Sequence, residues 1–228
     1  SSDLKREVMK YIDNLDKVAE ITGSVNNIYK SGNIITGTNT DWKGIYDTLV
    51  FFNISHLTKC CILGTGGTAR AAIFALQKLQ ISPTVLYREP ISENTRSLIE
   101  SFPDLKYITY KELANQQILN DIEIIINTTP VGMINYEESL PINFDQLDNV
   151  NYKDKYFMDV VFNPLHTKLH ECFGKKGAKI IDGLWVLIFQ GIEAFSLWSD
   201  KINADKSFFS KDDVLLIHKF LEGNIKEK

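Results

Sequence analysis

Runs of apolar residues alternate along the chain with segments in which apolar residues recur at helical spacing. The short runs are typical of buried parallel strands and lie at 60–63, 83–87, 106–109, 122–126, 156–161 and 178–181. The helical pattern fills intervals between them, at 68–76, 91–102 and 166–173. Strands that alternate with helices in this way predict an α/β fold with a doubly wound parallel sheet over residues 59–182.

The segments on either side of this region predict further elements. Helices are expected at 4–19, 42–51, 183–198 and 211–221. Gly23 would end the first of them, and Asp41 could cap the second. Residues 25–29 and 34–35 predict a hairpin between these two helices.

The composition limits the classes of function. The 228 residues are 44% hydrophobic and 24% charged, with a net charge of -4, which gives no general attraction to nucleic acid or to an anionic membrane. No apolar run approaches the roughly 18–20 residues that span a bilayer.

Cys60, Cys61 and Cys172 show no metal-ligand spacing, and the first two are expected to be core thiols of a cytoplasmic protein. His166 and His170 lack the glutamate of a metalloprotease motif and are expected on a helix surface, so no metal site is predicted.

A glycine-rich stretch joins the first strand of the predicted sheet to its helix. Gly64, Gly66 and Ala69 fill the three small positions of the dinucleotide fingerprint G-x-G-x-x-A. Gly64 would allow the tight turn, Gly66 would let the backbone approach a pyrophosphate, and the free N–H groups at the helix start would face the phosphates. An ordinary tight turn is the alternative, but strand, loop and helix stand in the order that favours nucleotide binding.

Two loops at the carboxyl ends of predicted strands add to this hypothesis. Arg88 follows the second strand, where an arginine favours the 2′-phosphate of NADP and an acid favours NAD. Glu89 beside it opposes that choice, because a carboxylate repels a phosphate. Residues 127–133, with the sequence NTTPVGM, are rich in hydroxyl, amide, Pro and Gly groups at an edge where such sheets bind ligands.

Segments along nearly the whole chain resemble the motifs of the shikimate dehydrogenase family, in the order in which that family has them. They are Leu4-Lys5, GSVNN at 23–27, GTNTD at 37–41, GTGGTARA at 64–71, Tyr87-Arg88, NTTPVGM at 127–133, DVVFNPLHT at 159–167 and the helix at 183–198. This resemblance implies an oxidoreductase of aromatic amino-acid (chorismate) biosynthesis that interconverts 3-dehydroshikimate and shikimate, with NADP (NADPH) as cofactor.

The resemblance also implies roles for individual residues. Lys5 and Asp41 fall at the catalytic pair, and Ser1, Asn26 and Gln190 fall at substrate contacts. The implied cofactor contacts are Gly64, Thr65, Gly66, Gly67, Thr68, Ala69, Arg88, Asn127, Thr128, Thr129, Val160 and Gly183. The implied partner is a small-molecule substrate, with neither nucleic acid nor a membrane.

The expected architecture has two parts. Residues 43–182 form a Rossmann-like NADP-binding domain, and residues 1–42 together with 183–228 form the remnant of an α/β substrate domain. The family has a further N-terminal segment, with a Ser-x-Ser pair for the substrate carboxylate, which we expect this chain to lack. The spelling NTDWKGI at 39–45 and Val186-Leu187 resemble the last segment of the fungal pentafunctional aromatic-biosynthesis (AROM) protein, which implies other segments of a larger polypeptide as neighbours.

Departures from the family pattern leave two alternatives open. Asn27 and Phe162 replace a threonine and a tyrosine, which bears on substrate contacts, and Glu89 bears on cofactor choice. One alternative is an NAD- or quinate-using dehydrogenase of the same family. The other is a catalytically silent relative with a regulatory or structural role.

Overall fold

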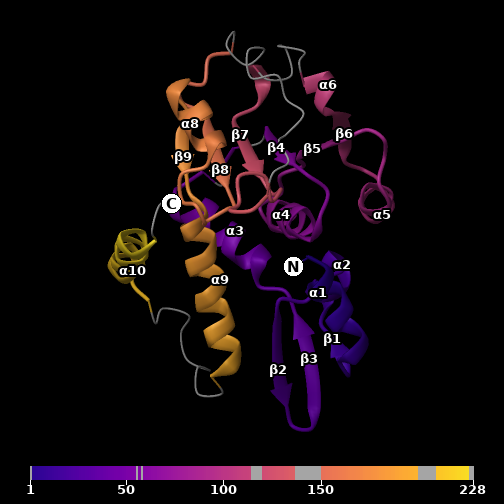
Figure 1. Ribbon diagram of the computed structural model, residues 1–228. Helices are drawn as coiled ribbons and strands as arrows, with labels where there is room; N and C mark the ends of the chain where they lie inside the picture. The colour runs from indigo at the N-terminus through magenta and orange to yellow at the C-terminus, as the bar shows by residue number, and fades with distance from the viewer. Residues whose placement is uncertain are drawn as a thin grey trace.

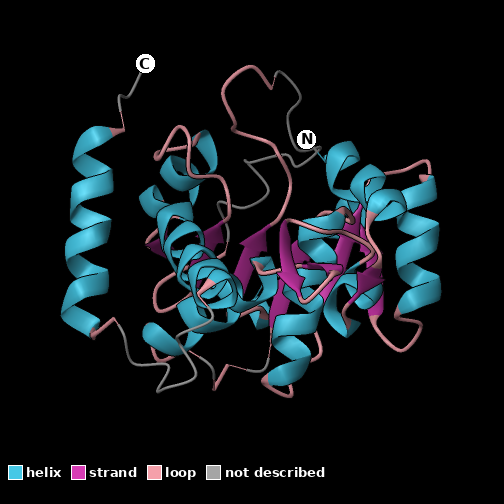
Figure 2. Ribbon diagram, turned by 90° about the horizontal axis from the view of Figure 1, so that it is seen from below, coloured by secondary structure: helices cyan, strands magenta, loops and turns pink. Residues whose placement is uncertain are grey.

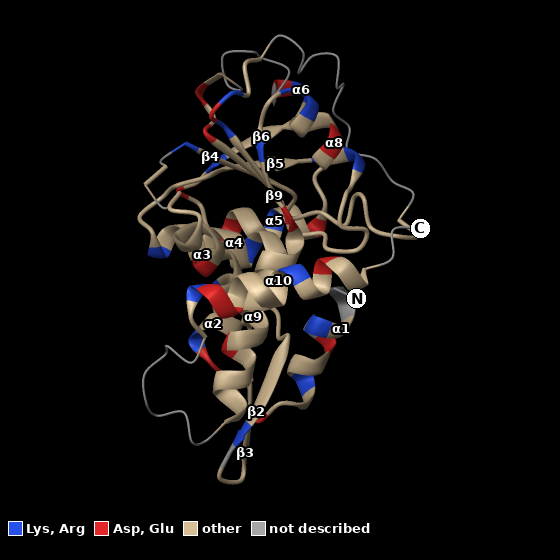
Figure 3. Ribbon diagram, turned by 90° about the vertical axis from the view of Figure 1, so that its left-hand side faces the viewer, with Lys and Arg blue, Asp and Glu red and all other residues tan. Residues whose placement is uncertain are grey.

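The computed structural model describes residues 2–54, 56–57, 59–113, 120–136, 150–199 and 209–225. Figure 1 shows a larger sheet at one end of the molecule and a smaller sheet at the other. Helix α3 (Asp41–Phe51) lies between them, and α9 (Gly183–Trp198) runs from there alongside the smaller sheet. None of the helices formed by these residues is long and apolar enough to cross a bilayer. Acidic and basic residues are interspersed over both ends of the molecule (Figure 3).

The larger sheet is the predicted doubly wound sheet. Its parallel strands are β4 (Cys60–Leu63), β5 (Thr84–Tyr87), β6 (Lys106–Thr109), β7 (Ile124–Asn127), β8 (Tyr156–Asp159) and β9 (Lys179–Ile181). Their order, β6-β5-β4-β7-β8-β9, reverses direction between β4 and β7. Such a switch point opens a crevice at the carboxyl ends of the strands. The sequence prediction of this fold class is therefore confirmed.

Helices cover both faces of this sheet (Figure 2). They are α4 (Gly67–Lys78), α5 (Glu93–Ser101), α6 (Tyr110–Leu113) and α8 (Lys168–Lys175), together with α3 and α9. Two apolar clusters fill the space on either side of the strands, because every side chain of β4 and β7 is buried. Cys60 and Cys61 are free thiols in β4, and burial raises the pKa of both. The prediction that they are core thiols is confirmed.

The smaller sheet contains the predicted hairpin. Strands β2 (Asn27–Ser31) and β3 (Ile34–Thr38) pair antiparallel, and β1 (Asn14–Leu15) adds to β3 in parallel. The last helix, α10 (Lys211–Asn224), lies beside α9, where the ring of His218 stacks on Trp185 at 4.0 Å. Both helices agree with the predicted positions.

The single helix predicted over residues 4–19 is wrong. The segment forms α1 (Ser2–Glu7), a 3-10 turn at Val8–Tyr11, strand β1 and α2 (Lys17–Thr22). Polar side chains at 13 and 16 explain the break. The carboxylate of Asp13 accepts a hydrogen bond from Ile35 N at 2.9 Å, and Asp16 caps α2 by accepting from Ala19 N at 2.8 Å. Gly23 ends α2 at a φ of 60°, as predicted.

Candidate active site

Four side chains that are far apart in the sequence meet at the junction of the two sheets. Lys5 of α1 places its Nζ 2.7 Å from Asp41 Oδ2 in the first turn of α3. Asn26 Nδ2, just before β2, donates to Asp41 Oδ1 at 2.6 Å and to Gln190 Oε1 of α9 at 3.2 Å. The structure thus brings together Lys5, Asp41, Asn26 and Gln190, which we call the polar cluster.

The backbone around the polar cluster is held in place by further hydrogen bonds. Lys5 O accepts from Val25 N at 2.9 Å, which fixes α1 to the segment before β2. Asn26 Oδ1 accepts from Thr40 N at 2.8 Å, which fixes the same segment to the start of α3. The geometry therefore depends on main-chain contacts as well as on the side chains themselves.

The prediction that Asp41 caps α3 is wrong. Thr40 is the N-cap residue, and Asp41 is the first residue of the helix. Its carboxylate is nine-tenths buried and accepts from Lys5 and Asn26 instead of from the helix amides. A carboxylate at this position is favoured by the helix dipole and is still available to orient a cation.

The glycine-rich loop lies against the loop that follows β7. Gly64 has a φ of +106°, and a Cβ there would lie 2.8 Å from Thr129 Cγ2. Thr128 Oγ1 donates to Leu63 O at 2.7 Å, and Asn127 Oδ1 accepts from Thr129 Oγ1 at 2.7 Å. A side chain on Gly64 would therefore force these two loops apart.

The start of α4 fits the pyrophosphate of a dinucleotide. Gly66 is the N-cap residue and makes no side-chain hydrogen bond to the helix, so the first-turn amides have no side-chain cap. A Cβ on Gly66 would meet nothing within 4 Å, which leaves the approach to these amides open. Ala69 is fully buried, as close helix–strand packing requires. Thr65 and Thr68 flank the same turn, and Thr65 Oγ1 lies 3.0 Å from Thr95 Oγ1 of α5.

A chain of contacts joins the glycine-rich loop to the polar cluster. A Cβ on Gly67 would lie 3.3 Å from Ser24 Oγ, which accepts from Asn39 Nδ2 at 2.7 Å. Asn39 Oδ1 in turn accepts from Asp41 N at 2.9 Å. Sequence reasoning did not single out Ser24 and Asn39, although both belong to quoted motifs. Ser24 contacts Gly67, in a segment more than 40 residues away, and Asn39 is linked to that contact through Ser24. No local sequence pattern displays such a contact.

Arg88 and Glu89 follow β5, as predicted. Arg88 is half-buried, and the Glu89 carboxylate lies 3.3 Å from Lys111 Nζ. Both partners of that ion pair are exposed, so the pair contributes little to stability. It does balance the negative charge of Glu89 beside Arg88.

Val160 and Gly183, the remaining predicted cofactor contacts, lie near the end of β8. A Cβ on Gly183 would lie 2.8 Å from Val160 O and 2.4 Å from Val161 O, so α9 begins directly against this strand end. Ser1 lies outside the described residues. Among the described residues, no group of three or more His, Cys, Asp or Glu side chains is placed to hold a metal ion.

The expectation that His166 and His170 both lie on a helix surface is wrong: His166 is exposed but precedes the helix, and His170 is buried. The helix begins at Lys168 and is capped by Thr167, which turns His170 toward the sheet, where 4% of it is exposed. Its Nε2 lies 3.7 Å from Oδ2 of Asp159, a fully buried carboxylate at the end of β8. Burial lowers the pKa of His170 to about 4 and raises the pKa of Asp159 to about 6.

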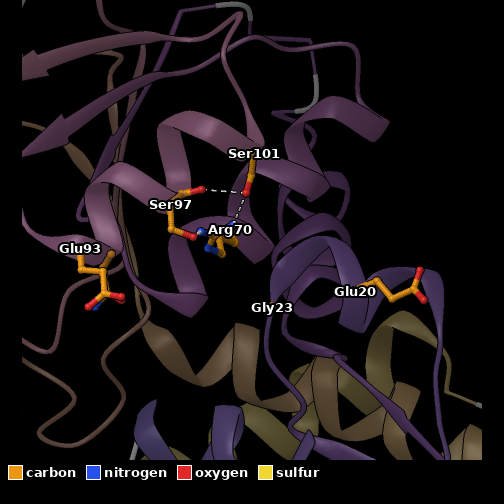
Figure 4. Close-up of a pocket in the computed structure, with 7 residues that line it drawn as sticks. Glu20, Gly23, Arg70, Glu93, Ser97 and Ser101 are labelled. Carbon is orange, nitrogen blue, oxygen red and sulfur yellow. Dashed lines mark hydrogen bonds between the residues drawn. The ribbon is translucent and has the colours of Figure 1, made fainter.

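A pocket of about 290 Å³ lies apart from the polar cluster, between α2, α4 and α5. Figure 4 shows Arg70 at its centre, directed at two serines of α5, with Glu20 and Glu93 pointing away from it. Arg70 donates to Ser97 Oγ at 2.8 Å and to Ser101 Oγ at 2.9 Å. This buried guanidinium ties α4 to α5, which indicates a structural role.

Replacement of Arg70 should therefore destabilise the fold. We expect Arg70→Met to lower the free energy of unfolding by about 2 kcal/mol, because hydrogen bonds to a buried charge are lost. Urea denaturation would measure the change. Arg96→Met is the matched control, because Arg96 is an exposed arginine of α5, the helix to which Arg70 donates its hydrogen bonds. Equal stability of the two variants would contradict the structural role of Arg70.

No family model matches the chain. It is nevertheless 34% identical over 206 residues to the shikimate dehydrogenase (NADP(+)) of Caldicellulosiruptor saccharolyticus, with 90% of this chain and 72% of that protein covered. It is 32% identical over 211 residues to the protein of the same name from Methanosphaera stadtmanae, with the same two shares covered.

Solved structures agree with these relatives. A chorismate mutase/shikimate 5-dehydrogenase fusion protein from Clostridium acetobutylicum superposes with a TM-score of 0.78 and 28% identity, covering 98% of this chain and 76% of that one. Shikimate 5-dehydrogenase from Listeria monocytogenes gives a TM-score of 0.77 and 26% identity, covering 95% and 75%. The sequence identity, the extent of the match and the shared fold together establish that this chain belongs to the shikimate dehydrogenase family.

Proposed function

We propose that the chain catalyses the reversible reduction of 3-dehydroshikimate to shikimate with NADPH, with Lys5 and Asp41 as its catalytic pair. One observation carries this proposal: Lys5, Asp41, Asn26 and Gln190 converge in a family member next to a loop that fits a dinucleotide. A structural salt bridge alone would not require an amide from each of two further segments.

The pair Lys5–Asp41 has the chemistry that ketone reduction needs. Negative charge develops on the carbonyl oxygen during the reaction, and a proton must be delivered to it. The Lys5 ammonium can stabilise that charge and donate the proton. Asp41, 2.7 Å away, holds the ammonium in place. Asn26 and Gln190 would hydrogen-bond substrate hydroxyls, so that an analogue without them would leave polar groups unpaired.

The cofactor would be held at the junction of the sheet and α4. NADPH, when bound, supplies the hydride. Gly64 to Ala69 would receive its pyrophosphate at the start of α4, and Thr128 and Thr129 would line the same crevice from the neighbouring strand. Arg88 would contact the 2′-phosphate. Val160 and Gly183 would border the cofactor at the end of β8, where their close packing leaves room for no side chain on Gly183.

The test is NADPH formation from shikimate and NADP, followed by absorbance. We expect turnover by the wild-type chain and none by Lys5→Ala. Turnover by neither protein, although NADP binds, would favour the alternative of a catalytically silent relative. If the chain needs the N-terminal part of the family's substrate domain, a version extended by that part would turn over where the chain alone does not.

The NAD- or quinate-using alternative has one observation in its favour besides Glu89. The Listeria protein named above was solved in complex with shikimate and NAD. In this chain, the ion pair of Glu89 with Lys111 reduces the repulsion that Glu89 would exert on a 2′-phosphate, and Arg88 is the residue that favours NADP. Assays with NAD and with quinate in parallel would separate the two specificities.

We also propose two domains for this chain, a larger polypeptide that contains it and a cytoplasmic location. Residues 43–182 would act as the cofactor domain, and 1–42 with 183–228 as the substrate domain. The motif NTDWKGI supports a narrower relation to the last segment of the fungal pentafunctional protein, hence a larger polypeptide. The free buried thiols support a cytoplasmic location. Mass spectrometry of the natural polypeptide that carries this sequence would test the relation to a larger protein.

A further inference from the structure

Asp159 is a buried carboxylate that the proposed reaction does not use. It is fully excluded from solvent at the end of β8, next to the strand that carries Asn127 (Figure 1). Its Oδ1 accepts from Asn127 Nδ2 at 2.9 Å and from Val161 N at 3.0 Å. Its Oδ2 accepts from Thr167 Oγ1 at 2.9 Å. A buried charge needs such partners, and here they belong to two different loops.

These partners hold the loop at 127–132 from both ends. Asn127 begins the loop, and its Oδ1 accepts from Thr129 N and Thr129 Oγ1 at 3.1 and 2.7 Å. Gly132 ends it, and a Cβ there would lie 2.9 Å from the Cβ of Thr167, the residue that donates to Asp159. The carboxylate is therefore bonded to the first residue of the loop and to the residue against which the last one packs.

The loop at 127–132 also faces the glycine-rich loop. The contact between Gly64 and Thr129 is so close that a displaced Thr129 would change the shape of the crevice. His170 is a further titratable neighbour, but its Nε2 lies 3.7 Å from Asp159, too far for a hydrogen bond. The hydrogen-bonded partners of Asp159 in the described chain all belong to the ends of β7 and β8 and the loops that follow.

We propose that Asp159 is a positioning residue that fixes the loop at 127–132, and with it the cofactor crevice, by hydrogen bonds to Asn127 and Thr167. Its role in cofactor binding rests on the proposed function. Its role in fixing the loop does not, and can be measured in the free protein.

Hydrogen exchange of the free protein, followed by mass spectrometry, tests the inference. We expect Asp159→Leu to speed exchange in the peptide 127–136 about tenfold or more, because three buried donors lose their acceptor. Asp159→Asn should restore near wild-type exchange, since its amide oxygen can replace Oδ1 and its NH₂ can donate to Thr167 Oγ1. Thr48→Val is the matched control, because it removes a buried hydrogen bond inside α3, away from this loop.

Calorimetric titration with NADP completes the test. The dissociation constant should rise about tenfold or more in Asp159→Leu and stay near the wild-type value in Asp159→Asn and Thr48→Val. Unchanged exchange in 127–136 of folded Asp159→Leu would overturn the inference, as would an Asn variant as perturbed as the Leu variant. A wild-type chain that binds NADP without oxidising shikimate would refute the proposed reaction, and the exchange data would still decide the role of Asp159.

Discussion

Lys5→Met should lower turnover by several orders of magnitude and leave the fold intact. The ammonium of Lys5 is the charged donor of the polar cluster, and its loss should lower kcat by about 10²–10⁴-fold, the usual contribution of a positioned acid or oxyanion donor. The fold should change little, because the Lys5 side chain is 37% exposed and such ion pairs contribute about 0–1 kcal/mol. NADP affinity should also stay unchanged, since no proposed cofactor contact involves Lys5.

The control for this prediction is a second lysine–aspartate pair. Lys43 pairs with Asp47 along the same helix that begins with Asp41, but neither contacts the polar cluster in the described structure. Lys43→Met should retain wild-type kcat. Steady-state assays with shikimate and NADP, and thermal unfolding of both variants, would measure the difference. A kcat of Lys5→Met close to that of Lys43→Met would refute the catalytic role of Lys5, whatever the stability of the variant.

The larger sheet could be predicted from the sequence because its signals are local. The central strands β4 and β7 are short apolar runs buried on both faces, and the intervening helices carry a stripe of apolar residues. The glycine-rich loop could be predicted for the same reason, because its small residues follow one another within six positions. The helix at 183–198 begins and ends at the predicted residues, since Asp182 caps it and its apolar pattern is continuous.

The failures have a common physical cause. The apolar stripe at 4–19 is genuine, but Asp13 and Asp16 form hydrogen bonds with backbone N–H groups, and β3 pairs with Asn14 and Leu15. His170 is buried with Leu169 and Phe173 on the side of α8 that faces the sheet, which the polar character of a histidine does not indicate. Both errors concern segments whose partners lie in other elements of the fold, β3 for residues 14 and 15 and β8 for His170, where tertiary contacts override the local pattern.

The polar cluster required the family resemblance. Nothing in the spacing of Lys5, Asn26, Asp41 and Gln190 predicts that they meet, because the last lies 164 residues from Asn26. The packing of α3 on α9 brings Asp41 and Gln190 together, and Gly44 lets the two helices approach, because a Cβ on it would lie 2.6 Å from Val186 O. Helix approach of this kind becomes visible only when the fold is known.

Gly183→Ala should damage both stability and activity. Its added Cβ would lie 2.4 Å from Val161 O, a backbone atom at the end of β8 that cannot rotate away. Relief of this overlap must move the start of α9 away from the strand. We expect a loss of about 3 kcal/mol in the free energy of unfolding, at the upper end for overpacking.

The same helix offers a matched control for that substitution. A Cβ on Gly191 would meet nothing within 4 Å, so Gly191→Ala should be neutral or stabilise the protein by about 0.5–1 kcal/mol through helix propensity. A shift of α9 would also displace Gln190 from Asn26, and a displacement of about 1 Å at a site can reduce turnover 10²-fold. Thermal unfolding and kcat/KM for shikimate would test both effects. If Gly183→Ala matched Gly191→Ala in both measurements, the start of α9 would tolerate a side chain, and the close packing at the end of β8 would not be what positions Gln190.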